Sequence, residues 1–246
     1  DTTDRNRTSP FALTGNKFEF RMLGSQASVA DPNIVLNTIV AQAFADAVDA
    51  LSGAQDFETA CKAYTEKLFK EHYRIIFNYN GYGPDWEPEA ERRGLLNNKT
   101  TADAIPECYK RENIDVFVRQ GVYTEKEVIA RANINLVNYI KVINIEALTM
   151  LEMGKQDIYP AVNAYVAELC SVIAAKRAVS EKMSCKADTA LAEQLSKMND
   201  AFADAMKKLE KDLSEMPAGE GPASQKMAHV IVPDMDAVRT LADGME

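Results

Sequence analysis

Apolar residues return at helical spacing along three long stretches in the second half of the chain. The first stretch runs from Thr124 to Gly154, and its apolar positions are Val128, Ala132, Leu136, Ile140, Ile143, Ala147 and Leu151. Thr124 and Glu127 have the spacing of a capping box, which satisfies free backbone N–H groups where a helix begins. The stretches 157–183 and 187–215 repeat the pattern. Three such helices joined by short turns predict an antiparallel bundle.

Two shorter helices are expected before this bundle. The first runs from Pro32 to Leu51, with Asp31 as its cap and the proline in its first turn. The second runs from about 56 to 77. Residues 78–123 contain several glycines and prolines, which permit only short helices there.

The two ends of the chain complete the predicted fold. Residues 216–224 are rich in glycine, proline and alanine and predict a linker, and a short helix is expected over 233–243. A strand is expected near the N-terminus, where residues 17–22 alternate strictly between polar and apolar side chains. We therefore predict a mainly α fold: an antiparallel long-helix bundle with a short N-terminal strand and loop segment.

The predicted strand also carries the most informative chemistry. One face is apolar, and the other places a carboxylate between two cations, namely Lys17, Glu19 and Arg21. On alternation alone, the simpler interpretation is the solvated face of a half-buried strand. Arg7 adds a further cation upstream. A carboxylate among fixed cations can hold a divalent metal beside a polyanion, which is the arrangement that phosphoryl transfer requires.

Composition and charge narrow the classes of function. A hydrophobic content of 46% with 26% charged residues is typical of a globular protein. The net charge of −9 argues against a nucleic-acid partner, because there is no surplus of cations to replace counterions. No run reaches about 18 continuous apolar residues, so no membrane partner is expected.

The four cysteines form no CxxC pair and lie apart from both histidines in sequence, which argues against a zinc site. Cys61 and Cys170 fall within helical patterns, and we expect both to be buried free thiols. Free thiols fit a reducing compartment, so a cytoplasmic protein is expected.

The motifs around the strand resemble the closing section of the catalytic domain of glutamine synthetases. That family has an Asn-Arg-Ser/Thr stretch, then a strand of the form basic-x-Glu-x-Arg, then a helix opened by Asn-Pro or Pro-Asn. The matching segments here are Asn6-Arg7-Thr8-Ser9, Lys17-Phe18-Glu19-Phe20-Arg21 and Pro32-Asn33. These catalytic motifs cover only about the first forty residues.

The wider sequence resembles the type III branch of the family. The segments that resemble it are Gly81-Tyr82 with Trp86, Glu89-Ala90-Glu91-Arg92-Arg93-Gly94-Leu95, and the tail Val230-Ile231-Val232-Pro233-Asp234-Met235 followed by Val238-Arg239. One position departs from the commoner pattern, in which a second arginine stands five residues past the first. Ala12 occupies that spacing here, so the task of the second arginine is unassigned.

The resemblance implies an activity and a role for each residue of the strand. Such an enzyme condenses glutamate with ammonia through γ-glutamyl phosphate, using ATP and Mg²⁺ or Mn²⁺. Glu19 would hold the metal, and Arg21 would bind the carboxylate of the substrate glutamate. Arg7 would be catalytic at the transferred phosphoryl group of the nucleotide, and Lys17 would bind the nucleotide. The structural alternatives are an ion pair between Glu19 and Arg21 and a solvated loop arginine at position 7.

The resemblance also implies an organisation for the chain. Its parts would be the end of the catalytic domain (1–53), a helical and irregular connecting region (54–123) and a C-terminal helical bundle (124–246). The chain would be the C-terminal part of a longer enzyme that assembles as a homo-oligomeric ring, and it would be inactive alone. The alternative is a non-catalytic helical oligomerisation or interaction module, in which 124–215 mediate assembly. Since the family places the strand's neighbours upstream, we expect Lys17–Met22 to be held by another copy or to pack without a sheet.

Overall fold

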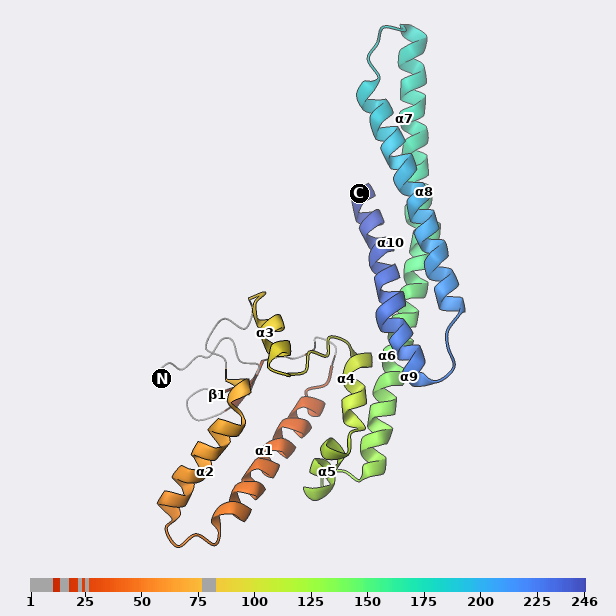
Figure 1. The fold of residues 1–246 in the computed structure, drawn as a ribbon. Helices are drawn as coiled ribbons and strands as arrows, with labels where there is room; N and C mark the ends of the chain where they lie inside the picture. Colours follow the sequence, from red (N-terminus) through yellow and green to blue (C-terminus); the bar gives the residue numbers. More distant parts are fainter. Residues whose placement is uncertain (1–10, 14–17, 22–23, 25–26, 77–82) are drawn as a thin grey trace. The chain divides into compact units, whose positions relative to one another are not determined.

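Helices make up most of the chain (Figure 1). The structure is a computed structural model, and it describes residues 11–13, 18–21, 24, 27–76 and 83–246. The chain divides into two compact units, one of residues 1–99 with 109–128 and one of residues 100–108 with 129–246. The mainly α fold with a helical bundle and a short N-terminal strand is confirmed. The three-part division of the chain stays a prediction.

The first unit begins with a small β-hairpin. β1 (Phe11–Leu13) pairs antiparallel with β2 (Phe18–Phe20), and Ala12 lies opposite Glu19. The expectation that the strand pairs with another copy or packs without a sheet is therefore wrong. Residues 11–13 supply its backbone partners from the same chain, which satisfies groups that a lone strand leaves open.

Two packed helices follow the hairpin, α1 (Ala30–Leu51) and α2 (Phe57–Glu71), and a single 3₁₀ turn, η1 (Tyr73–Ile75), follows α2. The Asp56 side chain caps α2 by accepting the backbone N–H of Thr59 at 3.2 Å. The predicted cap at Asp31 is wrong, because α1 begins one residue earlier and Ser28 Oγ accepts the N–H of Ala30 at 3.1 Å.

α3 (Trp86–Arg92) is fastened to the end of α2 by two arginines. Nη1 of Arg93 donates to the carbonyl oxygen of Ile76 at 2.7 Å, and Nη1 of Arg74 donates to the carbonyl oxygen of Gly94 at 3.3 Å. Gly94 has a φ of +68°, a conformation that glycine adopts without strain. These contacts close the chain back on itself after α3.

Short helices fill the rest of the region 78–123 that the structure describes, as predicted. α4 (Thr101–Cys108) belongs to the second unit, and α5 (Arg111–Arg119) packs on α1 in the first. The capping box at the start of α6 (Glu125–Met153) is confirmed. The Thr124 hydroxyl accepts the backbone N–H of Glu127 at 3.3 Å, and Oε2 of Glu127 accepts the N–H of Thr124 at 2.8 Å.

The second unit is built around a helix that is longer than predicted. α6 continues through a π-helical turn, η2 (Gly154–Ile158), into α7 (Tyr159–Val179) without a break. The predicted helix end at Gly154 is wrong. Gly154 is buried, and a Cβ there would lie 2.5 Å from Sδ of Met206, so the glycine permits close packing instead of a turn. The wider π turn accommodates Pro160, whose ring would clash with a regular helical carbonyl.

α8 (Lys186–Ser214) runs back antiparallel along α7, and the last helix returns along α8 (Figure 1). That last helix consists of α9 (Glu220–Lys226), a π turn η3 (Met227–Ile231) and α10 (Val232–Met245). The linker predicted over 216–224 is therefore already helical from Glu220. The final helix is present but longer than the expected 233–243.

The main core lies where α6, α8, η3 and α10 meet. Its buried side chains are Ala147, Leu151, Phe202, Met206, Leu209, Met227, Ile231 and Val238. The buried Asn199 donates through Nδ2 to Oδ1 of Asn163 at 3.1 Å and to the carbonyl oxygen of Tyr159 at 3.3 Å, which ties α8 to α7. A smaller cluster joins Ile105 of α4 to Ala132 and Leu136 of α6.

All four cysteines are free thiols. Cys61 is half-buried, but Cys170 is exposed, so the expectation of a buried thiol is wrong for Cys170. Which residues of α7 are covered depends on its contact with α8, and the periodicity of a single helix does not identify that contact. Cys185, at the start of α8, is the buried one.

Two helices have the length and the apolar composition of a membrane-spanning segment: α1 and the 55-residue helix made of α6, η2 and α7. Only 6% of each apolar window is buried. A core helix of a soluble protein meets the same two conditions, so length and composition do not assign a membrane span. The absence of a membrane partner stays a prediction.

Candidate functional site

The β-hairpin brings together two of the four predicted site residues. Nη2 and Nε of Arg21 lie 2.9 and 3.2 Å from Oε2 of Glu19. The structural alternative predicted this ion pair, because residues two apart on a strand share a face. The side chain of Glu19 is 52% exposed, whereas that of Arg21 is 21% exposed. Arg7 and Lys17, predicted for the phosphoryl group and the nucleotide, lie outside the described residues.

Glu19 alone does not complete a metal site. Mg²⁺ takes about six oxygen ligands in octahedral geometry, and several of these can be water or substrate phosphate. Within the described residues, no group of three or more His, Cys, Asp or Glu side chains gathers where it could hold a metal ion. The part of the chain that the structure describes therefore supplies one candidate ligand.

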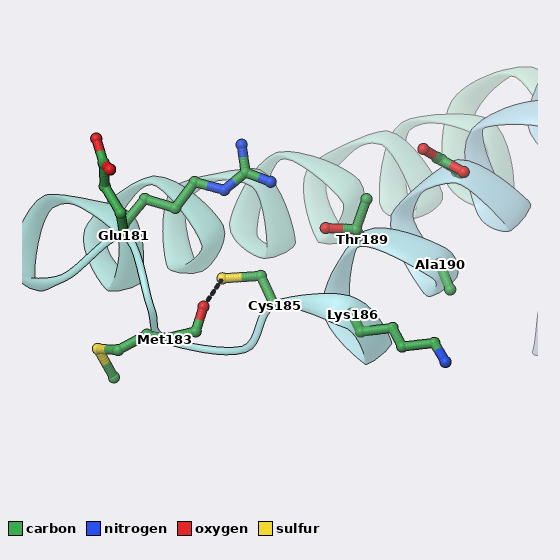
Figure 2. A pocket seen from close by; sticks show the side chains of 8 residues that line it. Glu181, Met183, Cys185, Lys186, Thr189 and Ala190 are labelled. Atoms are coloured by element: carbon green, nitrogen blue, oxygen red, sulfur yellow. Dashed lines mark hydrogen bonds between the residues drawn. The ribbon is translucent and has the colours of Figure 1, made fainter.

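A second candidate is a hollow of about 710 Å³ at the turn between α7 and α8 (Figure 2). Its lining residues are Arg177, Glu181, Met183, Cys185, Lys186, Thr189, Ala190 and Glu193. The Sγ of Cys185 donates to the carbonyl oxygen of Met183 at 3.7 Å, across the turn. The sequence gives no signal for this hollow, because side chains of both charges are also typical of an ordinary helix surface.

The hollow lacks the arrangement of a catalytic site. Cys185 and Thr189 offer a thiol and a hydroxyl, but no histidine lines the hollow to remove a proton from either. Beside it, Nζ of Lys176 lies 2.6 Å from Oδ2 of Asp188, and this hydrogen bond raises the pKa of the lysine. The pair links α7 to α8 and stabilises the turn.

A third polar cluster fastens α4 to the C-terminal helix. Oδ1 of Asp103 lies 2.9 Å from Nε2 of His229, and Oδ2 of Asp103 accepts the hydroxyl of Thr100 at 2.7 Å. Nε2 of Gln225 donates to the carbonyl oxygen of Ala102 at 2.9 Å. The hydrogen bond from Thr100 and then that from His229 lower the pKa of Asp103. The periodicity of separate helices gives no signal for this contact, because its two sides lie 126 positions apart.

Comparisons with known proteins identify the family. The family model described as the glutamine synthetase C-terminal domain matches residues 60–177. A glutamine synthetase of Butyrivibrio fibrisolvens is 36% identical over 254 aligned positions, which cover the whole chain. The chain belongs to the glutamine synthetase family.

Two further relatives carry the same family name, and one of them is of type 3. A type-3 glutamine synthetase of Dictyostelium discoideum is 38% identical over 168 residues, or 67% of the chain, and a glutamine synthetase of Bacteroides fragilis is 30% identical over 220 residues, or 87% of the chain. The matched segments cover 36%, 23% and 30% of the length of these three relatives, so the chain matches only part of each. The family model begins after β2, so it does not test the roles of Glu19 and Arg21.

Part of the type III resemblance, the segment around Glu89, has a structural explanation in this chain. Glu89 accepts hydrogen bonds from Arg92 and Arg93, with Nε of Arg92 at 2.7 Å. The hydrogen bond from Arg92 and then that from Arg93 lower the pKa of Glu89 to about 2. Because Arg93 also donates to Ile76, these residues hold α3 in place.

Proposed function

We propose that this chain forms the C-terminal portion of an ATP-dependent enzyme that joins ammonia to glutamate. The observation that carries the proposal is the relationship to a glutamine synthetase over the whole chain, including the strand with its Glu19 and Arg21 pair. The reaction transfers the γ-phosphoryl group of ATP to the side-chain carboxylate of glutamate. Ammonia then displaces phosphate from γ-glutamyl phosphate to give glutamine.

Each strand residue has a proposed task in that reaction. Mg²⁺ or Mn²⁺ at Glu19 would neutralise charge on the phosphates, with further ligands from outside the described residues. Arg21 would bind the substrate carboxylate through its planar guanidinium. Arg7 would stabilise the transferred phosphoryl group, and Lys17 would bind the nucleotide.

The observed pair is compatible with these tasks. Arg21 uses only Oε2 of Glu19, and the structure shows no hydrogen bond to Oε1 from any described residue. A pair with a half-exposed carboxylate contributes little stability, so its rearrangement around substrate costs little. Glutamate, ammonia and ATP as partners, the homo-oligomeric ring and the cytoplasmic location belong to the same proposal. So does the absence of a nucleic-acid partner, which the net charge of −9 supports.

Substitution of Glu19 in the full-length enzyme tests the proposal. Glu19→Gln should lower turnover by orders of magnitude in a biosynthetic assay, because the amide keeps the shape but loses the charge that a cation needs. Glu58→Gln is the matched control, since Glu58 forms an exposed pair with Lys62 on α2. Unchanged turnover in Glu19→Gln would contradict the metal role.

Substitution of Arg21 tests the substrate role separately. Arg21→Lys should raise the KM for glutamate more than that for ATP, because lysine lacks the bidentate fork. A larger effect on ATP would mean that Arg21 serves the nucleotide. The 246-residue chain alone should show no γ-glutamyl transfer, because the described residues supply only one candidate metal ligand.

A further inference from the structure

α6 carries a second apolar face, opposite the face that packs into the core. Ala147 and Leu151 are buried, whereas Ile145 and Leu148 are 62% and 52% exposed. Ile134 and Val142 extend the exposed face toward the N-terminus of the helix. A helix that is apolar on all sides is normally covered on all sides, so this outer face points to a partner.

The centre of the outer face is a stripe of four residues with a defined order. Lys141, Ile145, Leu148 and Glu152 follow one another at steps of four, three and four, which keeps them on one side of an α-helix. The stripe therefore reads cation, apolar, apolar, carboxylate along the helix. Both charged side chains are exposed, and neither forms an ion pair with any residue that the structure describes.

Two copies of this stripe are complementary when they lie antiparallel. The two charged residues and the two apolar residues share one midpoint, between Glu146 and Ala147. A two-fold axis at that midpoint sets two copies of α6 antiparallel. Lys141 then lies opposite Glu152 of the other copy, twice, and Ile145 lies opposite Leu148 of the other copy, twice. If the two end residues carried charges of the same sign, the same rotation would place like charges opposite one another.

We propose that the outer face of α6 is an interface between two copies of this chain, arranged antiparallel about the midpoint of Lys141–Glu152. The apolar pair forms its centre, and the two ion pairs lie at its ends and fix the register. The stripe is about 16 Å long, at 1.5 Å of rise per residue, so the contact is small and the dimer is a reversible one. The proposal names an assembly surface and does not depend on the proposed activity.

Charge reversal provides the test, and the mass of the 246-residue chain in solution provides the readout. Sedimentation equilibrium over about 1 to 300 µM should show reversible association from 27.2 kDa to twice that mass. Lys141→Glu and Glu152→Lys should each weaken dimerisation at least tenfold, because each places like charges opposite one another. The double variant should recover the original constant within about threefold.

Lys197→Glu is the matched control. Lys197 is an exposed residue of α8, so this substitution makes the same change of charge as Lys141→Glu but away from the stripe. It should leave the dimer constant unchanged, and circular dichroism should show equal helicity in all variants. Monomer at every concentration, or a double variant as weak as the single ones, would overturn the proposal. Binding of the monomer to lipid vesicles would overturn it in favour of a membrane surface.

Activity measurements keep this proposal separate from the proposed function. An inactive parent enzyme whose chain still dimerises through the stripe would contradict only the function. A fully active parent with a chain that stays monomeric would contradict only the interface.

Discussion

At the scale of single residues, Glu89 links protonation to the stability of the first unit. Its two arginine partners lower its pKa from an ordinary 4.5 to about 2, so the folded state favours the charged carboxylate. That contribution is complete above pH 4.5 and is lost as the pH falls toward about 2. Acid should therefore loosen α3 from the end of α2.

Glu89→Gln should remove this dependence on pH. The variant should be less stable than the parent chain at pH 7, and the difference should shrink as the pH is lowered from 4.5 toward 2. Trp86, the chain's one tryptophan, lies 6.0 Å from the Arg93 guanidinium and reports the change by fluorescence. Glu58→Gln serves as the control, and an unchanged pH profile in Glu89→Gln would contradict the assignment.

Asp234 presents a different situation, because it is buried. Only 8% of the residue is exposed, Oδ2 has no hydrogen-bond partner among described residues, and Lys208 pairs with Oδ1. Lys208→Met would leave this carboxylate without its counter-charge and should lower the free energy of unfolding by about 1–3 kcal/mol. Lys207→Met, on the exposed side of the same helix, should change it by less than about 0.5 kcal/mol.

A double variant separates the charge from the packing of Lys208. Asp234→Asn added to Lys208→Met should recover part of the lost stability, since the amide is neutral. Equal melting of the single and double variants in urea would show that only packing is lost.

At the scale of elements, the π turn η2 keeps α6 and α7 in one helix. Glycine is unfavourable inside a helix by about 1 kcal/mol relative to alanine, so its place in η2 needs another reason. That reason is the approach of Met206 and Phe202, which would lie 2.5 and 3.2 Å from a Cβ at position 154. Both side chains are buried in the main core and have little room to move.

Gly154→Ala should therefore destabilise the second unit, by about 1–3 kcal/mol, against the usual preference for alanine. Gly244→Ala in α10 is the matched control. Its Cβ would meet only the terminal methyl of Met198, at 2.8 Å, which can rotate away. Gly244→Ala should leave the free energy of unfolding unchanged or raise it slightly, as measured by urea unfolding followed by circular dichroism. If Gly154→Ala stabilised the chain, the side chains of Met206 and Phe202 would be able to move aside for the added methyl group.

At the scale of the whole molecule, α4 belongs structurally to the helical unit although the chain places it before α5. A chain of 124–246 should still fold with strong helical circular dichroism, because its long helices share the main core. A chain of 100–246 should melt at a higher temperature, since it keeps Ile105 on Ala132 and Leu136 and the contacts to His229 and Gln225. Identical melting temperatures would show that α4 adds nothing to the unit.

The features that could be predicted from the sequence are those that depend on the spacing of residues close together in the chain. The helix expected over 187–215 is observed as Lys186–Ser214, and the Thr124 capping box is present, because both depend on residues close in sequence. The Glu19 and Arg21 pair was foreseen as the structural alternative for the same reason. The fold class followed from these elements.

The errors arose where distant contacts override local signals. Gly154 predicts a helix end, and residues 216–224 predict a linker, because glycine and proline commonly interrupt helices. In the structure, Met206 explains the glycine and π turns accommodate the prolines at 160 and 233. The contact of Asp103 with His229 was beyond sequence reasoning, since no spacing relates residues so far apart.

The unbroken helix through η2 sets how this chain can tolerate insertions and deletions. Each residue turns an α-helix by about 100°, so deleting one residue from α7 between Tyr159 and Leu169 would rotate every later side chain of α7 relative to α6. Leu169 would leave its cluster with Ala192 and Leu195, and α8 would lose its contact with α7. A deletion in the turn 180–184 would leave the rotation of the side chains within α7 and within α8 unchanged. We therefore expect length variation among related chains to occur in that turn and to be absent from the part of α7 that precedes Leu169.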